Sequence, residues 1–327
     1  MHIIDRHLRT PLHTALRRQR CRIGAALVLL ASFVSQYAMA ASFATGTISD
    51  ARFYSAALGA NSDYKIYQPV GYSSANKTYP VLYLLHGRGD NYQAWTRIQQ
   101  VLDELIATAQ ISPCLVVMPD APSSKRASFY VDSAYSGSDN PGKKVETALM
   151  MDLIPHIDAT YRTMAQRSSR AIGGYSMGGY GAMRLALAYP EQFAAALVLS
   201  PATYVPLPPA DSSTRTFGAF GSGPALFVEA IYQAKNYPAL LAPFAQKNLP
   251  VHFFIATGDD EYKNKSPDEA HDIDLETHLL FSKLVRTTNA TAELRIINGV
   301  HDWAAWDPLF REGVRDIFRK LQWSPSR

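Results

Sequence analysis

The chain has 327 residues, of which 47% are hydrophobic and 18% are charged, with 32 Lys or Arg and 28 Asp or Glu residues. Six of the basic residues and one of the acidic residues lie in positions 1–40, so positions 41–327 carry 26 basic and 27 acidic residues, a net charge of −1. With no cluster of Lys or Arg interleaved with aromatic residues in that part, nothing in the composition favours a nucleic-acid partner.

Residues 1–40 have the pattern of a secretory signal peptide. Arginines at positions 17, 18, 20 and 22 precede an apolar run over residues 23–34 and a small-residue exit, Ala38-Met39-Ala40. The apolar run is shorter than the roughly 20 residues that a membrane-spanning helix needs. We therefore expect cleavage near Ala40, export to the periplasm or the cell exterior, and no stable membrane insertion.

Residues 41–327 are expected to form one catalytic domain, because their number lies at the upper end of what a single hydrophobic core supports. Cys114 is the only cysteine that follows the leader, and it lies in an apolar run. Neither a disulfide framework nor a cysteine-based zinc site is therefore expected.

Short apolar runs rich in Val, Ile, Tyr and Phe alternate with stretches of helical period along this domain. Such alternation predicts an α/β sandwich, a mostly parallel sheet covered by helices on both faces, with an antiparallel edge near residues 51–70. The expected strands are residues 64–70, 81–85, 114–118, 171–175, 194–199, 251–256 and 293–297. The expected helices are residues 95–109, 145–161, 177–189 and a last helix that Asp307 caps and Pro308 begins.

A His-Gly-x turn, His86-Gly87-Arg88, follows the expected strand 81–85. Acyl transfer builds negative charge on the carbonyl oxygen of the substrate, and preorganised backbone N–H groups stabilise that charge. A turn of this kind suits an oxyanion hole, so the backbone N–H of Arg88 is one candidate donor.

Gly174-Tyr175-Ser176-Met177-Gly178 has the G-x-S-x-G pattern of a nucleophile elbow. It follows a short apolar strand and precedes an Ala/Leu-rich helical stretch, which is the order that an elbow requires. The serine sits on a strained strand-to-helix turn, and glycines on both sides allow the close approach of the two elements. The pattern predicts Ser176 as the nucleophile and the N–H of Met177 as the second oxyanion donor.

Two regions interrupt the alternation of strands and helices. Residues 121–144 are rich in Ser, Gly, Asp and Pro, and residues 201–250 contain a Pro-rich stretch and two short helical segments. Active sites of open α/β sheets lie at the carboxyl ends of the strands, where insertions shape substrate access. Residues 201–250 are therefore the candidate cap insertion.

Three carboxylates in succession, Asp259, Asp260 and Glu261, follow Gly258 and the expected strand 251–256. Glu261 is favoured as the triad acid because it stands three places after the glycine, whereas Asp260 would serve in a turn that is one residue tighter. Asp259 is the third candidate. The acid holds the tautomer of the histidine, a task for which Asp and Glu are both suitable.

The same region offers an alternative interpretation as a metal cluster. It lacks a His-Glu-x-x-His core and the mid-loop glycine of a calcium-binding hand, so a solvated acidic loop is the simpler interpretation and no metal is expected. The candidate ligands would be Asp259, Asp260, Glu261, Asp268, His271, Asp272, Asp274 and His278.

His301 is the best candidate for the base among the six histidines of residues 41–327. It follows the expected strand 293–297 and precedes the last helix. This is the position that the chain order serine, acid, histidine gives to the base of a triad.

With these residues placed, the chain resembles the feruloyl and acetyl-xylan esterase group of the α/β-hydrolases, which are relatives of S-formylglutathione hydrolase and of the mycolyltransferases. The similarity extends over residues 54–321. It rests on five motifs: YQPVGY at 67–72, YPVLYLLHG at 79–87, YVDS at 130–133, GGYSMGGYGA at 173–182 and HDWAAW at 301–306.

The resemblance implies a hydrolase sheet of eight strands, Ser176 as nucleophile, His301 as general base and then acid, and an acyl-enzyme that water resolves. It implies no cofactor. Among these relatives, the resemblance favours the exported, polysaccharide-facing esterases over the glutathione thioesterase. The thioesterase works in the cytosol, whereas this chain has the pattern of an export signal. The chain departs from many relatives at Glu261, where they carry Asp.

The expected activity is hydrolysis of a carboxylic ester, with a small-molecule or polysaccharide ester as substrate. Tyr130, Trp303 and Trp306 are candidates for an aromatic acyl pocket that would suit a feruloyl group, with core packing as the alternative role. An acyltransferase with the same triad and a non-catalytic binding module are the alternative functions.

Overall fold

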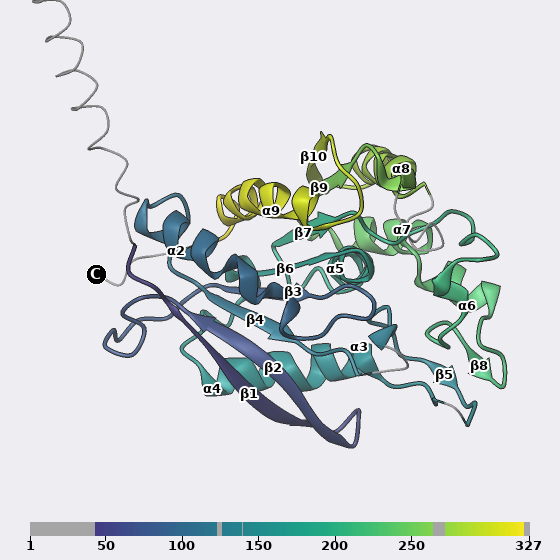
Figure 1. Ribbon diagram of the computed structural model, residues 1–327, viewed down its shortest axis with the longest axis horizontal. Coiled ribbons are helices and arrows are strands. Elements are labelled where there is room, and N and C mark those ends of the chain that lie inside the picture. Colours follow the sequence, from purple (N-terminus) through teal and green to yellow (C-terminus); the bar gives the residue numbers. More distant parts are fainter. Residues whose placement is uncertain (1–42, 123–125, 139, 264–271, 324–327) are drawn as a thin grey trace, which may run out of the picture. The chain divides into compact units, whose positions relative to one another are not determined.

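A mixed sheet of eight strands forms the centre of the computed structural model, which describes residues 43–122, 126–138, 140–263 and 272–323 (Figure 1). Its strand order is β1-β2-β4-β3-β6-β7-β9-β10. β1 pairs antiparallel with β2, β2 pairs antiparallel with β4, and all other pairs are parallel. In chain order the strands are β1 (Thr47–Ser55), β2 (Ala60–Gln68), β3 (Val81–Leu85), β4 (Leu115–Pro119), β6 (Arg170–Tyr175), β7 (Ala195–Leu199), β9 (His252–Gly258) and β10 (Thr291–Ile297). The predicted α/β fold and its antiparallel edge are confirmed.

The two faces of the sheet carry separate apolar layers because alternate side chains of each strand point to opposite faces. In β3, Leu82 and Leu84 pack in one layer, whereas Val81, Tyr83 and Leu85 pack in the other. Four central strands, β3, β4, β6 and β7, are buried along their whole length, as expected for strands that helices cover on both sides.

Helices cover both layers (Figure 1). The layer that contains Leu82 is covered by the 3₁₀ helix η1 (Ala94–Ile98), α2 (Gln99–Ala107) and α9 (Trp303–Phe318). The opposite layer is covered by α4 (Ile154–Thr160), α5 (Met177–Ala188), α6 (Glu229–Lys235), α7 (Tyr237–Lys247) and α8 (Ile273–Thr287). Shorter elements are α3 (Val145–Thr147), the π-helical segment Ala148–Leu153 before α4, the 3₁₀ turns Arg167–Ser169, Ser213–Arg215 and Glu261–Lys263, and the paired strands β5 (Ala134–Tyr135) and β8 (Ser222–Gly223).

The predicted start of the last helix is wrong. The helix begins at Trp303, and its N-cap is Asp302, whose Oδ1 accepts hydrogen bonds from the N–H groups of Ala304 (2.9 Å) and Ala305 (3.3 Å). Asp307 and Pro308 lie inside the helix, and Asp307 pairs with Arg97. An aspartate at position 302 satisfies two of the unpaired N–H groups of the first turn, so it outweighs the later Asp-Pro signal.

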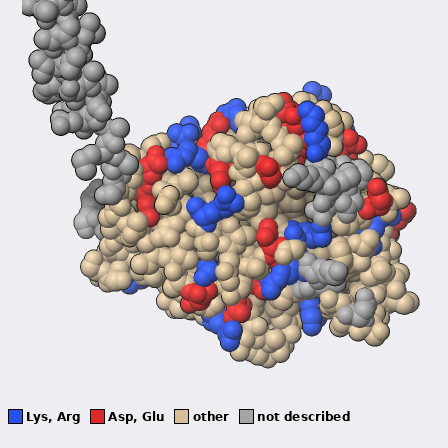
Figure 2. Space-filling view, viewed as in Figure 1, with Lys and Arg blue, Asp and Glu red and all other residues tan. Residues whose placement is uncertain are grey.

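The predicted leader, residues 1–40, lies outside the described residues and stays a prediction. Within the described ranges, no helix combines the length and the hydrophobicity needed to cross a bilayer. Basic and acidic side chains are interspersed on the face that Figure 2 shows.

A buried ion pair joins α3 to α5. Glu146 Oε2 lies 2.6 Å from Arg184 Nη2 and 3.6 Å from Lys235 Nζ, and the hydroxyl of Tyr189 donates to Oε1 at 2.9 Å. Burial opposes ionisation of this carboxyl, but Arg184, Lys235 and Tyr189 outweigh it and hold the pKa of Glu146 below its ordinary value. Its ionised form is therefore stabilised in the folded state.

We expect Glu146→Gln to lower the free energy of unfolding at pH 7 by about 3 kcal/mol, because it leaves Arg184 buried without its charged partner. The contribution of the carboxylate is complete above the pKa of an unfolded glutamate, about 4.3, and is lost as the pH falls through the lower folded-state pKa. Urea unfolding at several pH values should show a difference from the wild type that shrinks in acid. The matched control is Glu104→Gln, which breaks the more exposed pair with Arg311 and should cost less. Equal losses in the two variants would contradict the expectation.

Candidate active site

Ser176 stands at the turn between β6 and α5 with φ 55° and ψ −122°, a backbone conformation that residues other than glycine rarely adopt. Backbone hydrogen bonds hold it there: its N–H donates to Leu199 (2.9 Å), and its carbonyl accepts from Tyr180 and Ala202 (3.0 Å each). The surrounding structure thus fixes the strained turn.

The two glycines of the elbow pattern are required by contacts with backbone atoms. A Cβ atom at Gly174 would lie 2.3 Å from the carbonyl oxygen of Gly178, and one at Gly178 would lie 2.1 Å from that of Leu85. No real Cβ atom comes so close to a backbone oxygen. The glycines therefore let the start of α5 approach both β6 and the end of β3.

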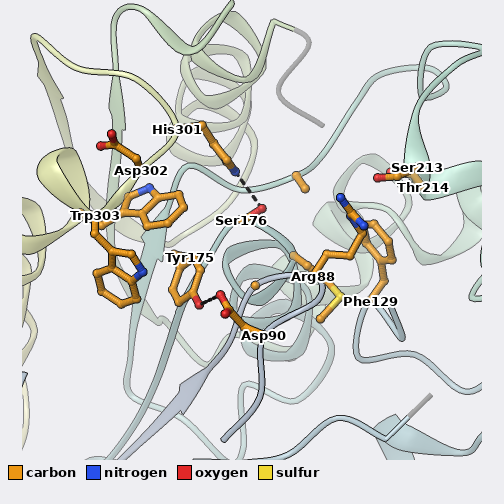
Figure 3. A pocket seen from close by; sticks show the side chains of 14 residues that line it. Arg88, Asp90, Phe129, Tyr175, Ser176, Ser213, Thr214, His301, Asp302 and Trp303 are labelled. Atoms are coloured by element: carbon orange, nitrogen blue, oxygen red, sulfur yellow. Dashed lines mark hydrogen bonds between the residues drawn. The ribbon is translucent and has the colours of Figure 1, made fainter. Parts of the chain in front are cut away.

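A continuous hydrogen-bonded chain connects three predicted site residues, and Figure 3 shows its bond between His301 and Ser176. His301 Nε2 lies 2.8 Å from Ser176 Oγ, and His301 Nδ1 lies 2.6 Å from Glu261 Oε2. The three residues come from three segments that each follow a strand, namely β6, β9 and β10. Because these strands are parallel, their carboxyl ends meet at one edge of the sheet.

Glu261 is fully buried and accepts hydrogen bonds on both carboxylate oxygens. Oε1 accepts from the hydroxyls of Ser200 (2.6 Å) and Thr257 (2.9 Å). Burial alone would raise the pKa of Glu261, but the bonds from His301, Ser200 and Thr257 outweigh it and hold the pKa below its ordinary value. An ionised acceptor at this place requires the proton of the imidazole to be on Nδ1, so Nε2 is free to accept a proton from Ser176.

The structure separates the three adjacent carboxylates that the sequence left open. Asp260 Oδ1 pairs with Lys263 Nζ at 2.8 Å, and Asp259 Oδ1 accepts from the N–H of Gly299 at 3.2 Å. The side chain of Glu261 is the one that contacts His301. Asp259 and Asp260 instead help to hold the loop that carries the histidine, since the N–H of Asp260 also donates to Gly299 at 3.0 Å.

Ser200 and Thr257 support the acid and were missed in the sequence. Ser200, with φ 40°, directly follows β7, and Thr257 lies in β9. Ser200 Oγ donates to Glu261 and accepts from Trp306 Nε1 at 3.0 Å, while the ring of Trp306 stands edge-on to the ring of His301 at 4.9 Å. Their positions at the carboxyl edge of the sheet were a usable signal, but small hydroxyl residues there are common.

A cavity of about 370 Å³ opens above Ser176 (Figure 3). Arg88 and Met177, the two predicted oxyanion donors, both line it, as do the predicted substrate-binding residues Trp303 and Trp306. The proposed cap insertion contributes Ala202, Ser213 and Thr214, whereas α7 packs in the helix layer beside α5. The complete lining is Gly87, Arg88, Asp90, Phe129, Tyr175, Ser176, Met177, Ala202, Ser213, Thr214, His301, Asp302, Trp303 and Trp306.

The expectation that Tyr130 lines the acyl pocket needs correction. Tyr130 is 1% exposed, lies outside the cavity lining, and donates its hydroxyl to the backbone carbonyl of His86 at 3.0 Å. Phe129 lines the cavity in its place. Both residues have positive φ angles, 48° and 52°, and of the two only Phe129 lines the cavity.

Two members of the alternative metal cluster, Asp268 and His271, lie outside the described residues. Over the ranges that the structure covers, no three or more His, Cys, Asp or Glu side chains are grouped so that they could hold a metal ion.

Comparison with known proteins gives one consistent picture. The family model described as "Putative esterase" matches residues 55–317. The chain is 36% identical to Esterase Rv1288 of Mycobacterium tuberculosis over 147 residues, and 32% identical to an endo-1,4-beta-xylanase/feruloyl esterase of Xylanibacter ruminicola over 195 residues. These matches cover 44% and 57% of this chain but only 30% and 26% of the two relatives, so the chain spans less than a third of either.

Solved structures share the fold at lower sequence identity. A ferulic acid esterase superposes with a TM-score of 0.66 at 24% identity, covering 85% of this chain and 99% of the other. An S-formylglutathione hydrolase from Agrobacterium tumefaciens superposes with a TM-score of 0.65 at 18% identity, covering 86% and 99%. These similarities establish the α/β-hydrolase fold.

Proposed function

The chain belongs to the esterase family, and from that membership we propose that it is a serine carboxylesterase that works through an acyl-enzyme on Ser176. The observation that carries the proposal is the chain of hydrogen bonds from Ser176 through His301 to the buried Glu261, at the floor of a cavity. A nucleophile, a base and an orienting acid in this order are the parts that acyl transfer needs.

Acylation begins when Ser176 Oγ attacks the ester carbonyl carbon and His301 Nε2 takes its proton. The negative charge that forms on the carbonyl oxygen is received by the backbone N–H groups of Arg88 and Met177. His301 then gives the proton to the leaving alkoxide oxygen, the ester C–O bond breaks, and the acyl group stays on Ser176. Glu261 remains ionised throughout and stabilises the imidazolium.

Deacylation repeats the sequence with water as the nucleophile. His301 Nε2 takes a proton from water, the hydroxyl oxygen attacks the acyl carbon, and the same two N–H groups receive the charge. Collapse of the tetrahedral intermediate releases the carboxylic acid, and the proton on His301 returns to Ser176 Oγ. The cycle converts one ester and one water into an alcohol and a carboxylic acid, returns Ser176 and His301 to their starting states, and uses no cofactor.

Aromatic side chains along the cavity favour an ester with a planar acyl group as the substrate. Trp303, which is partly exposed, offers a ring surface in the cavity that contains Ser176, whereas the cavity-lining rings of Tyr175 and Phe129 are almost fully buried. Exposed aromatic surfaces bind aromatic groups well. Relatives named for feruloyl ester cleavage point the same way. We propose feruloyl or acetyl esters of polysaccharide as the substrate class, met outside the cytoplasm after export by the leader.

The experiment that tests the function is release of p-nitrophenol from short-chain acyl esters, beside methyl ferulate and acetylated xylan, with residues 41–327 and with the Ser176→Ala variant as control. We expect serine-dependent cleavage, with the preferred acyl group identifying the substrate class. Absence of cleavage of every ester would contradict an esterase. A product that forms only when a sugar or lipid acceptor is added would establish an acyltransferase instead.

A further inference from the structure

Three consecutive backbone carbonyls at the end of β3 each accept a hydrogen bond from a buried side chain. The carbonyl of Leu85 accepts from Trp95 Nε1 (3.0 Å), that of His86 from the hydroxyl of Tyr130 (3.0 Å), and that of Gly87 from Nδ1 of His86 (2.7 Å). All three donors are at most 1% exposed. Each of the three peptide groups that precede Arg88 is therefore held by its own side-chain hydrogen bond.

The contacts of Nε2 determine which ring nitrogen of His86 carries the proton. Nε2 of His86 accepts a hydrogen bond from the backbone N–H of Ala121 at 3.2 Å, and a backbone N–H can only donate. Asp120 lies 3.6 Å from the same nitrogen, beyond hydrogen-bond length, and pairs with Arg126. The ring proton is thus on Nδ1, where it is donated to the carbonyl of Gly87.

The bond from His86 to Gly87 also fixes the next N–H. The carbonyl of Gly87 and the N–H of Arg88 belong to one peptide unit, which is trans, so the two groups point in opposite directions. Holding the carbonyl toward His86 fixes the direction of the Arg88 N–H. A Cβ atom at Gly87 would lie 2.5 Å from the ring of Tyr175, so this position between His86 and Arg88 has room only for glycine.

Tyr130 connects this segment to the nucleophile helix. Its carbonyl accepts from Arg184 Nη2 of α5 at 3.1 Å, and its ring packs where a Cβ atom at Gly181 of α5 would lie only 2.6 Å away. Its φ angle of 52° is a strained value that persists only when surrounding contacts impose it. Strain of this kind is typical of functional sites, and Tyr130 holds a carbonyl one peptide away from the Arg88 N–H.

We propose that His86 and Tyr130 are positioning residues of the oxyanion hole: together they orient the Arg88 N–H toward the carbonyl oxygen of the substrate. The inference rests on the proposed esterase function. Neither side chain lines the cavity or touches substrate. Both act through the backbone of the segment that they hold.

The test is Tyr130→Phe, which removes one hydroxyl and keeps the ring. We expect kcat for p-nitrophenyl acetate to fall roughly tenfold to a hundredfold, the loss typical of residues that orient a catalytic group, with KM little changed. The matched control is Tyr79→Phe. Tyr79 is equally buried, lies before the opposite end of β3, and its hydroxyl has no hydrogen-bond partner within the described part of the chain.

A second readout separates positioning from general loosening of the core. A p-nitrophenyl phosphonate reacts once with the nucleophile, and its phosphoryl oxygen gains negative charge in the same hole. We expect the phosphonylation rate of Tyr130→Phe to fall by the same factor as kcat, while the shape of the pH profile stays as in the wild type. Any of three results would overturn the inference. Tyr130→Phe could react at wild-type rates, Tyr79→Phe could lose as much activity as Tyr130→Phe, or the effect of Tyr130→Phe could be confined to KM.

If Tyr130→Phe does not fold, a pair of variants at His86 carries the same test. Glutamine retains an N–H donor for the carbonyl of Gly87, and leucine does not. We therefore expect phosphonylation to be faster in His86→Gln than in His86→Leu. Equal rates in the two variants would overturn the inference. A wild type that reacts with phosphonate but cleaves no ester would refute the esterase function and leave these comparisons valid.

Discussion

Ser176→Ala is expected to abolish ester cleavage, with kcat lowered by roughly 10⁶-fold, the loss seen when the nucleophile of a serine triad is removed. The reason is geometric. Ser176 Oγ is the atom that lies 2.8 Å from His301 Nε2, and an alanine leaves the base with no hydroxyl to activate. The measurement is the initial rate of p-nitrophenol release from a short-chain ester, together with mass spectrometry for an acyl adduct on the wild type.

The fold of this variant should be intact, because the backbone bonds that hold the turn involve no side-chain atom of Ser176. Circular dichroism and the thermal midpoint provide the check. A folded alanine variant with undiminished ester cleavage would refute Ser176 as the nucleophile and the proposed function with it.

Glu261→Gln should cause the second-largest loss, about 10⁴-fold in kcat, because an amide cannot fix the imidazole tautomer as a carboxylate does. Four donors converge on this side chain, from His301, from the hydroxyls of Ser200 and Thr257, and from the backbone N–H of Gly258. The NH₂ group of glutamine would face either the Nδ1–H of His301 or the backbone N–H of Gly258. Neither of these groups can accept a hydrogen bond, so each orientation places a donor against a donor. The loss should appear in kcat at all pH values where the wild type is active.

Asp260→Asn is the matched control, since it removes the neighbouring carboxylate with the same chemical change. Asp260 pairs with Lys263 at a partly exposed position, and we expect only a small effect on kcat. A large loss in Asp260→Asn with a mild one in Glu261→Gln would reverse the assignment of the acid. Mild losses in both would mean that neither carboxylate orients His301.

Much of the fold was predictable because its signals are local. The apolar runs that became β3, β6, β7 and β9 are buried over their whole length, and runs of that kind need no distant information to be recognised. The boundary error at the last helix had a local cause as well, since both Asp302 and Asp307 are good caps. The cap that fitted the first turn of the helix in three dimensions was the earlier one.

The elbow and the placement of His301 were also accessible from the sequence, because glycine spacing and chain order express steric and topological needs directly. The predicted Ser176 and His301 are 125 residues apart, and the structure brings their reacting atoms within hydrogen-bond distance. Parallel strands explain this proximity, since segments that follow their carboxyl ends converge at one edge of the sheet.

The sequence by itself therefore determined the layered α/β architecture, the turn that carries Ser176, and the order of the candidate serine, acid and histidine. Only the tertiary structure decided which of three adjacent carboxylates contacts His301, that Ser200 and Thr257 support it, and that Tyr130 holds the His86 carbonyl instead of lining the cavity. The physical reason is that these choices depend on side-chain directions in tight turns. A change of one residue in such a turn redirects a side chain by a large angle, and only contacts between segments distant in sequence fix it.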